Sequence, residues 1–244
     1  MEKNFSIIVP AYNEEATIER AVREATAVFC GFGKPFEIIV VDDGSDDATA
    51  KITERLAAEI DNLRLLRHEN NRGKGEAVRT GVMDASGEYI LFFDADLSTH
   101  PSEAAAFLPH LEKNKVLIGS RTAAGAEIGQ EQPWYRVRYG KFFNYLVRKI
   151  VGLPHHDTQC GFKIFGAEIG KRVFGAMPPG AGWLFDVELI VCATAAGCEI
   201  VELPIRWNHG EVSRIRFLEV LKEMPRLWRL RKIMKKIDTT MHRS

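Results

Sequence analysis

The stretch Phe5-Ser6-Ile7-Ile8-Val9-Pro10-Ala11-Tyr12-Asn13-Glu14 joins an apolar run to a polar turn, which is typical of a buried strand that ends in a loop. Four further apolar runs follow, so the candidate strands are residues 5–9, 37–41, 63–66, 89–93 and 116–118. Amphipathic runs of helical length separate them, at residues 16–29, 48–60, 76–85 and 102–112. This alternation predicts an α/β fold with a mostly parallel sheet wound by right-handed crossovers.

The second half of the chain is organised differently. We expect a Gly-rich polar loop and an aromatic, basic helix, followed by another helix and a strand, at residues 122–132, 134–150, 185–196 and 199–205. No repeat or low-complexity linker interrupts the sequence. We therefore expect one domain over residues 1–213, divided near residue 120, and a tail over residues 214–244.

Composition limits the classes of protein to which the chain can belong. With 45% hydrophobic and 27% charged residues, it is typical of a soluble globular domain. Four cysteines without a C-x-x-C pair indicate reduced thiols in the cytoplasm. The N-terminus lacks a basic segment before an apolar one, and the longest uncharged stretch, residues 173–185, is too short to span a bilayer. We expect neither a signal peptide nor a membrane-spanning helix.

The formal net charge of +0 conceals a basic tail, since residues 214–244 hold ten Lys or Arg and three Asp or Glu. Helical spacing gives this tail an apolar face and a basic face. The first holds Phe217, Val220, Leu221, Met224 and Trp228, and the second holds Lys222, Arg226, Arg229, Lys232 and Lys236. Such a helix is predicted to lie on an anionic membrane surface, or alternatively to pack on the body of the protein or on a second subunit. Pro225 must kink the helix or begin a second one.

Polar segments follow each of the first four strands, where sheets of this type bind their ligands. They are residues 10–14, 42–47, 70–75 and 94–96. Tyr12 offers a ring face to a base, and Asp42 can accept the N–H of a base imide. Lys74 and its neighbouring glycines can approach a pyrophosphate, while Asp94 and Asp96 offer hard oxygens to Mg²⁺ or Mn²⁺.

Each segment also has a purely structural interpretation. Asp42-Asp43-Gly44-Ser45 makes a good turn and helix cap, and residues 70–75 fit an ordinary loop because they do not match the P-loop pattern. Structural roles alone do not predict acidic residues at successive strand ends, where they repel one another unless a cation binds. The set as a whole favours a site for a nucleotide diphosphate and a divalent metal.

The ordered set resembles the family 2 glycosyltransferases of the GT-A fold, through residues 10–14, 42–45 and 94–96. Residues 157–163 (DTQCGFK) and 183–188 (WLFDVE) narrow the resemblance to dolichyl-phosphate glucosyltransferases and their prokaryotic polyprenyl-phosphate relatives. The likeness covers about residues 5–216. It implies a GT-A fold with a nucleotide-sugar half at residues 1–120 and an acceptor half at residues 121–213.

The resemblance also implies roles for single residues. Those assigned to the nucleotide sugar are Pro10, Tyr12, Glu14, Asp42, Asp43 and Lys74, the last near the phosphates. Asp94 and Asp96 are implied to flank the metal, with Asp96 the direct ligand. Relatives often carry Gln two residues after the second Asp, where this chain has Ser98.

A phosphate acceptor would need no strong general base, because the second pKa of a phosphate monoester is roughly 6. The site must instead hold this anion in line with the anomeric carbon, which favours arginines. Arg121 ends the fifth strand, and Arg136 and Arg138 lie on the next helix. The prediction is an inverting, metal-dependent hexosyltransferase that uses UDP-glucose and a polyprenyl phosphate. It would be peripheral on the cytoplasmic membrane face and have no nucleic-acid partner.

Other functions remain open on the sequence. GDP-mannose is the alternative donor. Residues 91–99 also resemble the nucleophile motif of haloacid dehalogenase phosphatases, although that motif normally opens their fold. A nucleotidyltransferase, or a nucleotide-sugar-binding protein without turnover, would use a similar site. A NAD-dependent enzyme is disfavoured because G-x-G-x-x-G does not follow the first strand.

Overall fold

The computed structural model describes residues 4–129, 144–178, 180, 182, 184–208 and 224–241. The strands of its main sheet are β1 (Phe5–Ala11), β2 (Phe36–Asp42), β3 (Leu63–Arg67), β4 (Tyr89–Phe92), β5 (Lys115–Ser120), β7 (Lys163–Gly166) and β8 (Glu199–Pro204). The α-helices are α1 (Ile18–Gly31), α2 (Thr49–Glu59), α3 (Lys74–Asp84), α4 (Ala104–Phe107), α6 (Ala167–Ala176), α7 (Phe185–Ala195) and α9 (Met224–Met241). Residues 144–151 are also helical.

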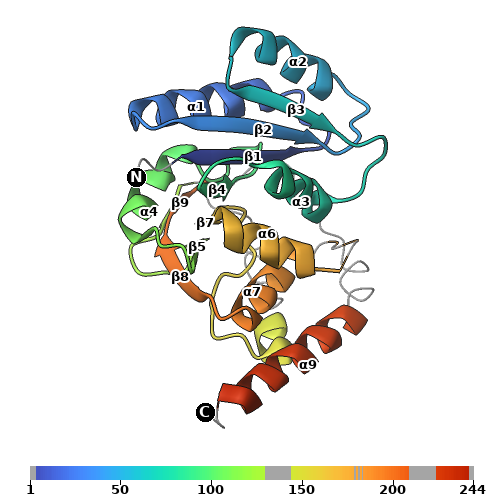
Figure 1. Ribbon diagram of the computed structural model, residues 1–244, viewed down its shortest axis with the longest axis vertical. Coiled ribbons are helices and arrows are strands. Elements are labelled where there is room, and N and C mark those ends of the chain that lie inside the picture. The colour runs from blue at the N-terminus through green and yellow to red at the C-terminus, as the bar shows by residue number, and fades with distance from the viewer. Residues whose placement is uncertain are drawn as a thin grey trace.

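The main sheet has seven strands in the order β3-β2-β1-β4-β7-β5-β8 (Figure 1). Strands β1 to β4 pair in parallel, as do β5 and β8, so the predicted mostly parallel sheet is confirmed. The sequence did not predict β7, which lies antiparallel between β4 and β5. A small second sheet pairs β6 (Glu127–Ile128) with β9 (Arg206–Trp207). Strand β6 lies within the expected polar loop, and β9 follows β8.

Side chains of the central strands alternate between two apolar layers. Ile8 and Phe92 are buried against α3, α6 and α7, whereas Ile7 and Leu91 are buried against α1, α2 and α4. Because helices cover both faces, these strands read as continuous apolar runs rather than as an alternating pattern. The first helix closes directly on its strand, since the Ile18 N–H donates to the Glu14 carbonyl at 2.9 Å.

The helix expected at residues 102–112 is confirmed only over α4. The chain there forms a 3₁₀ turn at Pro101–Glu103, the short α4, and a second 3₁₀ turn at Leu108–His110. Pro109 has no N–H and its ring crowds the preceding turn, so a continuous α-helix cannot pass through it. The segment still buries Ala104 and Phe107 against the sheet.

The tail helix α9 packs on the body of the protein beside α7, at the end of the molecule away from α1 and α2 (Figure 1). Its described part begins at Met224, so Pro225 lies in the first described turn. The buried face consists of Leu227, Leu230 and Met234, while Trp228 is 51% exposed. Trp228, predicted on the apolar face, therefore does not pack on the body of the protein. Phe217, Val220, Leu221 and Lys222 lie outside the described residues.

All four cysteines are free thiols. Among the helices in the described ranges, none combines the length and the apolar character of a membrane span.

Candidate functional site

The carboxyl ends of β1, β2 and β4 meet at one edge of the sheet because these strands are parallel. The loops after β1 and β2 interlock there. The Asn13 N–H donates to Ser45 Oγ at 2.9 Å, and the Glu14 N–H donates to Thr49 Oγ1 at 2.8 Å. Asn13 has a φ of 55°, a left-handed conformation that Asn adopts more readily than most residues. The loop that carries Tyr12 is thereby fixed to the loop that follows Asp42.

Asp42 ends β2 and is fully buried beside Arg67, the last residue of β3. The two are partners in the strand register, and Arg67 Nε lies 3.0 Å from Asp42 Oδ2. The Ser45 N–H donates to Asp42 Oδ1 at 3.2 Å. Sequence reasoning missed Arg67, although the pairing of β2 with β3 places it opposite Asp42.

Asp43 uses both carboxylate oxygens within the protein. Oδ1 lies 2.7 Å from His68 Nδ1 and accepts the Arg72 N–H at 2.9 Å. Oδ2 accepts the Gly73 N–H at 2.8 Å. Asp43 thus holds the loop that leads into Lys74. His68 carried no recognisable motif in the sequence.

Gly44 permits a close approach between the loops after β2 and β3. Its φ is 74°, and a Cβ at this position would lie 2.6 Å from the Asn70 carbonyl carbon. Real Cβ atoms are not found this close to a backbone carbon. Glycine at this position therefore allows the two polar segments to lie against each other.

Lys74, the first residue of α3, forms an ion pair with Asp94, which follows β4. Desolvation lowers the pKa of Lys74, but the carboxylates of Asp94 and Asp186 raise it by more, so its pKa lies above the ordinary value. The Lys74 side chain is still 39% exposed. Gly161 closes the other side of the Asp94 carboxylate, because a Cβ there would lie 2.5 Å from Asp94 Cγ.

Asp96 lies in a tight turn. The Leu97 N–H donates to the Asp94 carbonyl at 3.1 Å, and Leu97 has a φ of 56°. A left-handed conformation costs a bulky residue on the order of 1 kcal/mol and is found most often at functional sites. Ser98 donates twice to Asp96, from N–H to Oδ1 and from Oγ to Oδ2, each at 2.8 Å. Ser98 therefore fixes the orientation of the Asp96 carboxylate.

A second, buried ion pair lies close to Lys74. Lys163 in β7 is fully buried, pairs with Asp186 in the first turn of α7, and donates to the Cys160 carbonyl. Burial raises the pKa of Asp186, while the positive charges of Lys163 and Lys74 oppose the shift. Asp186 thus interacts with two lysines, one inside the protein and one at the edge of the site.

Arg121 follows β5 and is held by Asp157. Its Nε and Nη2 each lie 2.7 Å from an Asp157 oxygen, and its backbone N–H donates to Oδ2 at 2.9 Å. Desolvation lowers the pKa of Arg121, but pairing with Asp157 raises it by more. The guanidinium also lies 5.5 Å from the centre of the Trp207 ring. Arg136 and Arg138, expected to act with Arg121, lie outside the described residues.

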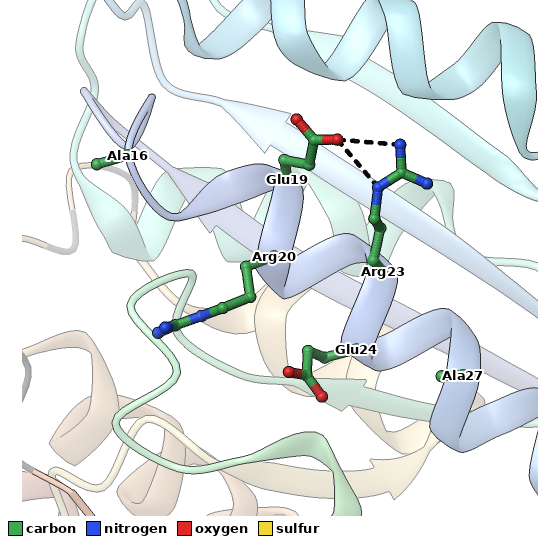
Figure 2. Close-up of a pocket in the computed structure, with 6 residues that line it drawn as sticks. All are labelled: Ala16, Glu19, Arg20, Arg23, Glu24 and Ala27. Carbon is green, nitrogen blue, oxygen red and sulfur yellow. Dashed lines mark hydrogen bonds and ion pairs between the residues drawn. The ribbon is translucent and has the colours of Figure 1, made fainter.

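Figure 2 shows a surface hollow along α1. It is lined by Ala16, Glu19, Arg20, Arg23, Glu24 and Ala27. All of them belong to α1 or to the turn before it, and Glu19 pairs with Arg23 at 2.9 Å. These are the features of a solvated helix face, so we do not assign the hollow to the site.

The donor atoms at the strand ends fit a divalent metal that also binds a diphosphate. Within the part of the chain that the structure describes, no three His, Cys, Asp or Glu side chains are grouped to hold a metal by themselves. Mg²⁺ commonly takes one or two carboxylates and completes its shell with phosphate oxygens and water. Asp96 offers such a carboxylate, partly exposed, and Lys74 offers a positive charge for the phosphates.

Known proteins share extended similarity with this chain. Residues 6–174 match the model of the family described as Glycosyl transferase family 2. The chain is 33% identical over 229 residues to a dolichyl-phosphate beta-glucosyltransferase of Mus musculus, a match that covers 87% of this chain and 70% of the relative. The dolichyl-phosphate beta-glucosyltransferase ALG5C of Trichomonas vaginalis is 35% identical over 241 residues, a match that covers 89% of this chain and 67% of the relative.

Solved structures of a glucosyl-3-phosphoglycerate synthase from Mycobacterium tuberculosis share the fold. One contains Mn²⁺ and UDP-glucose and matches with a TM-score of 0.62 at 21% identity, over 92% of this chain and 76% of the other. A second contains Mn²⁺, UDP and glucosyl-3-phosphoglycerate and matches with a TM-score of 0.63 at 22% identity, over the same 92% and 76%. At this identity the likeness shows the fold alone, and it confirms the GT-A architecture.

Proposed function

Since the chain belongs to glycosyl transferase family 2, we propose that it transfers glucose from UDP-glucose to a polyprenyl phosphate, with inversion at the anomeric carbon. The observation that carries this proposal is the Lys74–Asp94 ion pair beside Asp96. It gathers a cation and two carboxylates where a sheet of this kind binds its ligands. The relatives named dolichyl-phosphate beta-glucosyltransferase support glucose as the sugar and a lipid phosphate as the acceptor.

The loops after β1 and β2 are proposed to bind the nucleotide. The contributing residues are Pro10, Tyr12, Glu14 and Asp42, with Asp43 acting through the loop before Lys74. Tyr12 is partly exposed and can stack on a base, and Asp42 lies at the bottom of the same edge. Lys74 meets the diphosphate, because its cation is already oriented toward the strand ends by Asp94.

The residues at the end of β4 are proposed to hold the metal, each with a different role. Asp96 would hold Mg²⁺ or Mn²⁺, and Ser98 would keep its carboxylate in place. Asp94 flanks this position and orients Lys74. Such an ion, when bound, supplies charge stabilisation for the departing diphosphate.

Transfer is proposed to proceed by a single displacement. An ionised oxygen of the lipid phosphate forms a bond to the anomeric carbon while the bond from that carbon to the UDP β-phosphate oxygen breaks, which inverts the configuration. The acceptor needs no strong base because its oxygen is already ionised near neutral pH. Arg121, fixed by Asp157, is proposed to hold the acceptor phosphate, with Arg136 and Arg138 as further candidates from the sequence.

Helix α9 is proposed to bring the site to an anionic lipid surface on the cytoplasmic side. Its exposed side includes Trp228, Arg229, Lys232 and Lys235, and residues 225–235 contain no acidic residue. An exposed Trp among basic residues suits the membrane interface, and each Lys or Arg near an anionic leaflet contributes about 1 kcal/mol.

The test is transfer with purified protein, a polyprenyl phosphate, Mn²⁺ or Mg²⁺, and either UDP-glucose or GDP-mannose as the donor. We expect a glucosyl phospholipid with the β configuration, made from UDP-glucose. Preference for GDP-mannose, or retention of configuration, would contradict the proposal. Tight binding of UDP-glucose without transfer would identify a binding protein instead.

A further inference from the structure

Helix α9 contacts the donor-side helix α3 through Gly180. The Gly180 N–H donates to Glu76 Oε1 in α3 at 2.8 Å, and the Gly180 carbonyl accepts from Arg226 Nη1 in α9 at 2.7 Å. Glu76 is 5% exposed and lies two residues after Lys74. The backbone of one residue therefore joins the tail helix to the first turn of the helix that carries the phosphate-binding lysine.

The α9 end of this connection is firmly anchored. Arg226 pairs with both oxygens of Glu188, a fully buried residue of α7, and the Arg226 side chain is only 16% exposed. This corrects the expectation that Arg226 lies on the solvent-facing basic side of the tail. A guanidinium has donors in a fixed planar arrangement, so two bonds to Glu188 also determine where the third donor points. Leu227 and Leu230, buried in the next turn, hold the helix in the same place.

The α3 end is anchored as well. Arg79, one turn beyond Glu76, donates to the Met177 carbonyl at 3.2 Å. Helix α3 thus contacts both Met177 and Gly180. A change in the position of Gly180 would therefore displace Glu76. Glu76 lies at the start of α3, where its N–H donates to the Gly73 carbonyl at 3.0 Å.

We propose that Arg226 is a positioning residue, which makes the placement of Lys74, and hence the affinity for a nucleoside diphosphate, depend on the docking of α9 onto α7. The inference rests on the proposed function only for the identity of the ligand. Because coupling between two sites is reciprocal, a ligand that orders the start of α3 also favours the docked position of α9.

The experiment uses the full chain with Glu188→Gln and Arg226→Gln combined, because removing Arg226 alone would take its positive charge away from the buried Glu188 carboxylate. Hydrogen exchange of the free protein is compared over residues 72–78. We expect faster exchange there in the double variant. UDP affinity in the presence of Mn²⁺, measured by calorimetry, should fall by about fivefold or more. Arg231→Gln, on the same helix and 5.3 Å from the centre of the Trp228 ring, is the matched control and should match the wild type in both measurements.

A double-mutant cycle with Glu76→Ala distinguishes coupling through Gly180 from a general destabilisation of the protein. Glu76→Ala already cuts the connection at Gly180, so adding the double substitution should change UDP affinity by less than about twofold. Unchanged exchange at residues 72–78 in a folded double variant would overturn the inference, as would an equal loss of affinity in both backgrounds or in the Arg231→Gln control.

If the double variant does not fold, Arg226→Lys replaces it, since a single ammonium keeps the charge beside Glu188 without the fixed fork that reaches Gly180. The same faster exchange is expected, and its absence would overturn the inference. Failure of the wild type to bind UDP would count against the proposed donor, whereas the exchange comparison would still decide the role of Arg226.

Discussion

Lys74 and Asp94 are ion-pair partners across the gap between the start of α3 and the end of β4. The lysine expected at the phosphates and the first acid of the Asp-x-Asp motif therefore hold each other in place. The second acid has different neighbours, because both oxygens of Asp96 accept bonds from Ser98. The two acids of the motif should differ in function accordingly.

Asp96→Asn should abolish nearly all transfer while the protein stays folded, because it removes a charged ligand from a polar, partly exposed position without creating a cavity. A loss of several kcal/mol of charge stabilisation corresponds to at least about 100-fold in kcat. Asp94→Asn should act mainly on KM for the donor, through Lys74. Steady-state kinetics at varied Mn²⁺ distinguishes the two, with Asp61→Asn, exposed after α2, as the control. Near-normal turnover in Asp96→Asn would refute the metal assignment.

Gly161→Ala should reduce transfer by about tenfold or more with little change in melting temperature. The new Cβ would displace the Asp94 carboxylate, the mobile end of a side chain, and so disturb its pairing with Lys74. The matched control is Gly175→Ala, where no atom lies within 4 Å of the new Cβ and the helix should gain about 0.5–1 kcal/mol. Equal kinetics in the two variants would show that the Asp94 position does not matter.

Glu37→Gln should make the free energy of unfolding depend less on pH in the acidic range. Burial alone raises the pKa of Glu37, but hydrogen bonds from Ser6, Ser86 and Arg64 outweigh it and lower the pKa to about 2 from 4.5. A lowered pKa means that the charged form stabilises the fold above pH 4.5 and that this contribution disappears as the pH falls toward 2. Its upper bound is about 3 kcal/mol, and the Glu37 side chain is only 16% exposed.

Urea unfolding of wild type and Glu37→Gln between about pH 3 and pH 6 provides the measurement. The difference in unfolding free energy should be largest near pH 6 and should narrow steadily toward pH 3. Glu54→Gln, an exposed position on α2, should follow the wild type. A difference that stays constant with pH would mean that Glu37 has an ordinary pKa.

Substitutions on the exposed side of α9 should weaken binding to anionic vesicles. Replacing Arg229, Lys232 and Lys235 with Gln removes about 1 kcal/mol each, so flotation at low salt should fall by about tenfold or more, and Trp228→Ala should act on neutral vesicles as well. Met83→Ala, 48% exposed on α3, is the control. Deleting the tail would be a poor test, because it would also uncover α7. Unchanged flotation would contradict the membrane proposal.

Much of the site could be predicted because parallel strands place their carboxyl ends at one edge. That rule alone brings together Asp42, Asp94 and the loop before Lys74, and it needs no knowledge of side-chain packing. The side chains that contact these residues could not be predicted in the same way. The contact of Asp42 with Arg67 depends on the exact register of β2 against β3.

The least predictable element was β7. It has only four residues and begins with a lysine, a residue rarely found buried in a central strand. Lys163 is tolerated there because Asp186, distant in sequence, supplies the opposite charge. The position of Arg226 was predicted wrongly because its partner is also distant in sequence. Helical spacing places Arg226 among exposed basic residues, and it cannot reveal the ion pair with Glu188 on another helix.

The position of β7 also limits how proteins of this architecture can be recombined. Although β7 comes late in the chain, it lies between β4 and β5 in the middle of the sheet, and the turn before it supplies Gly161 against Asp94. A chimaera that joined residues 1–120 of one relative to the remainder of another would exchange a central strand and one wall of the proposed donor site. Donor preference should therefore not be transplantable with the N-terminal segment alone. A successful exchange would have to carry residues 157–166 with it.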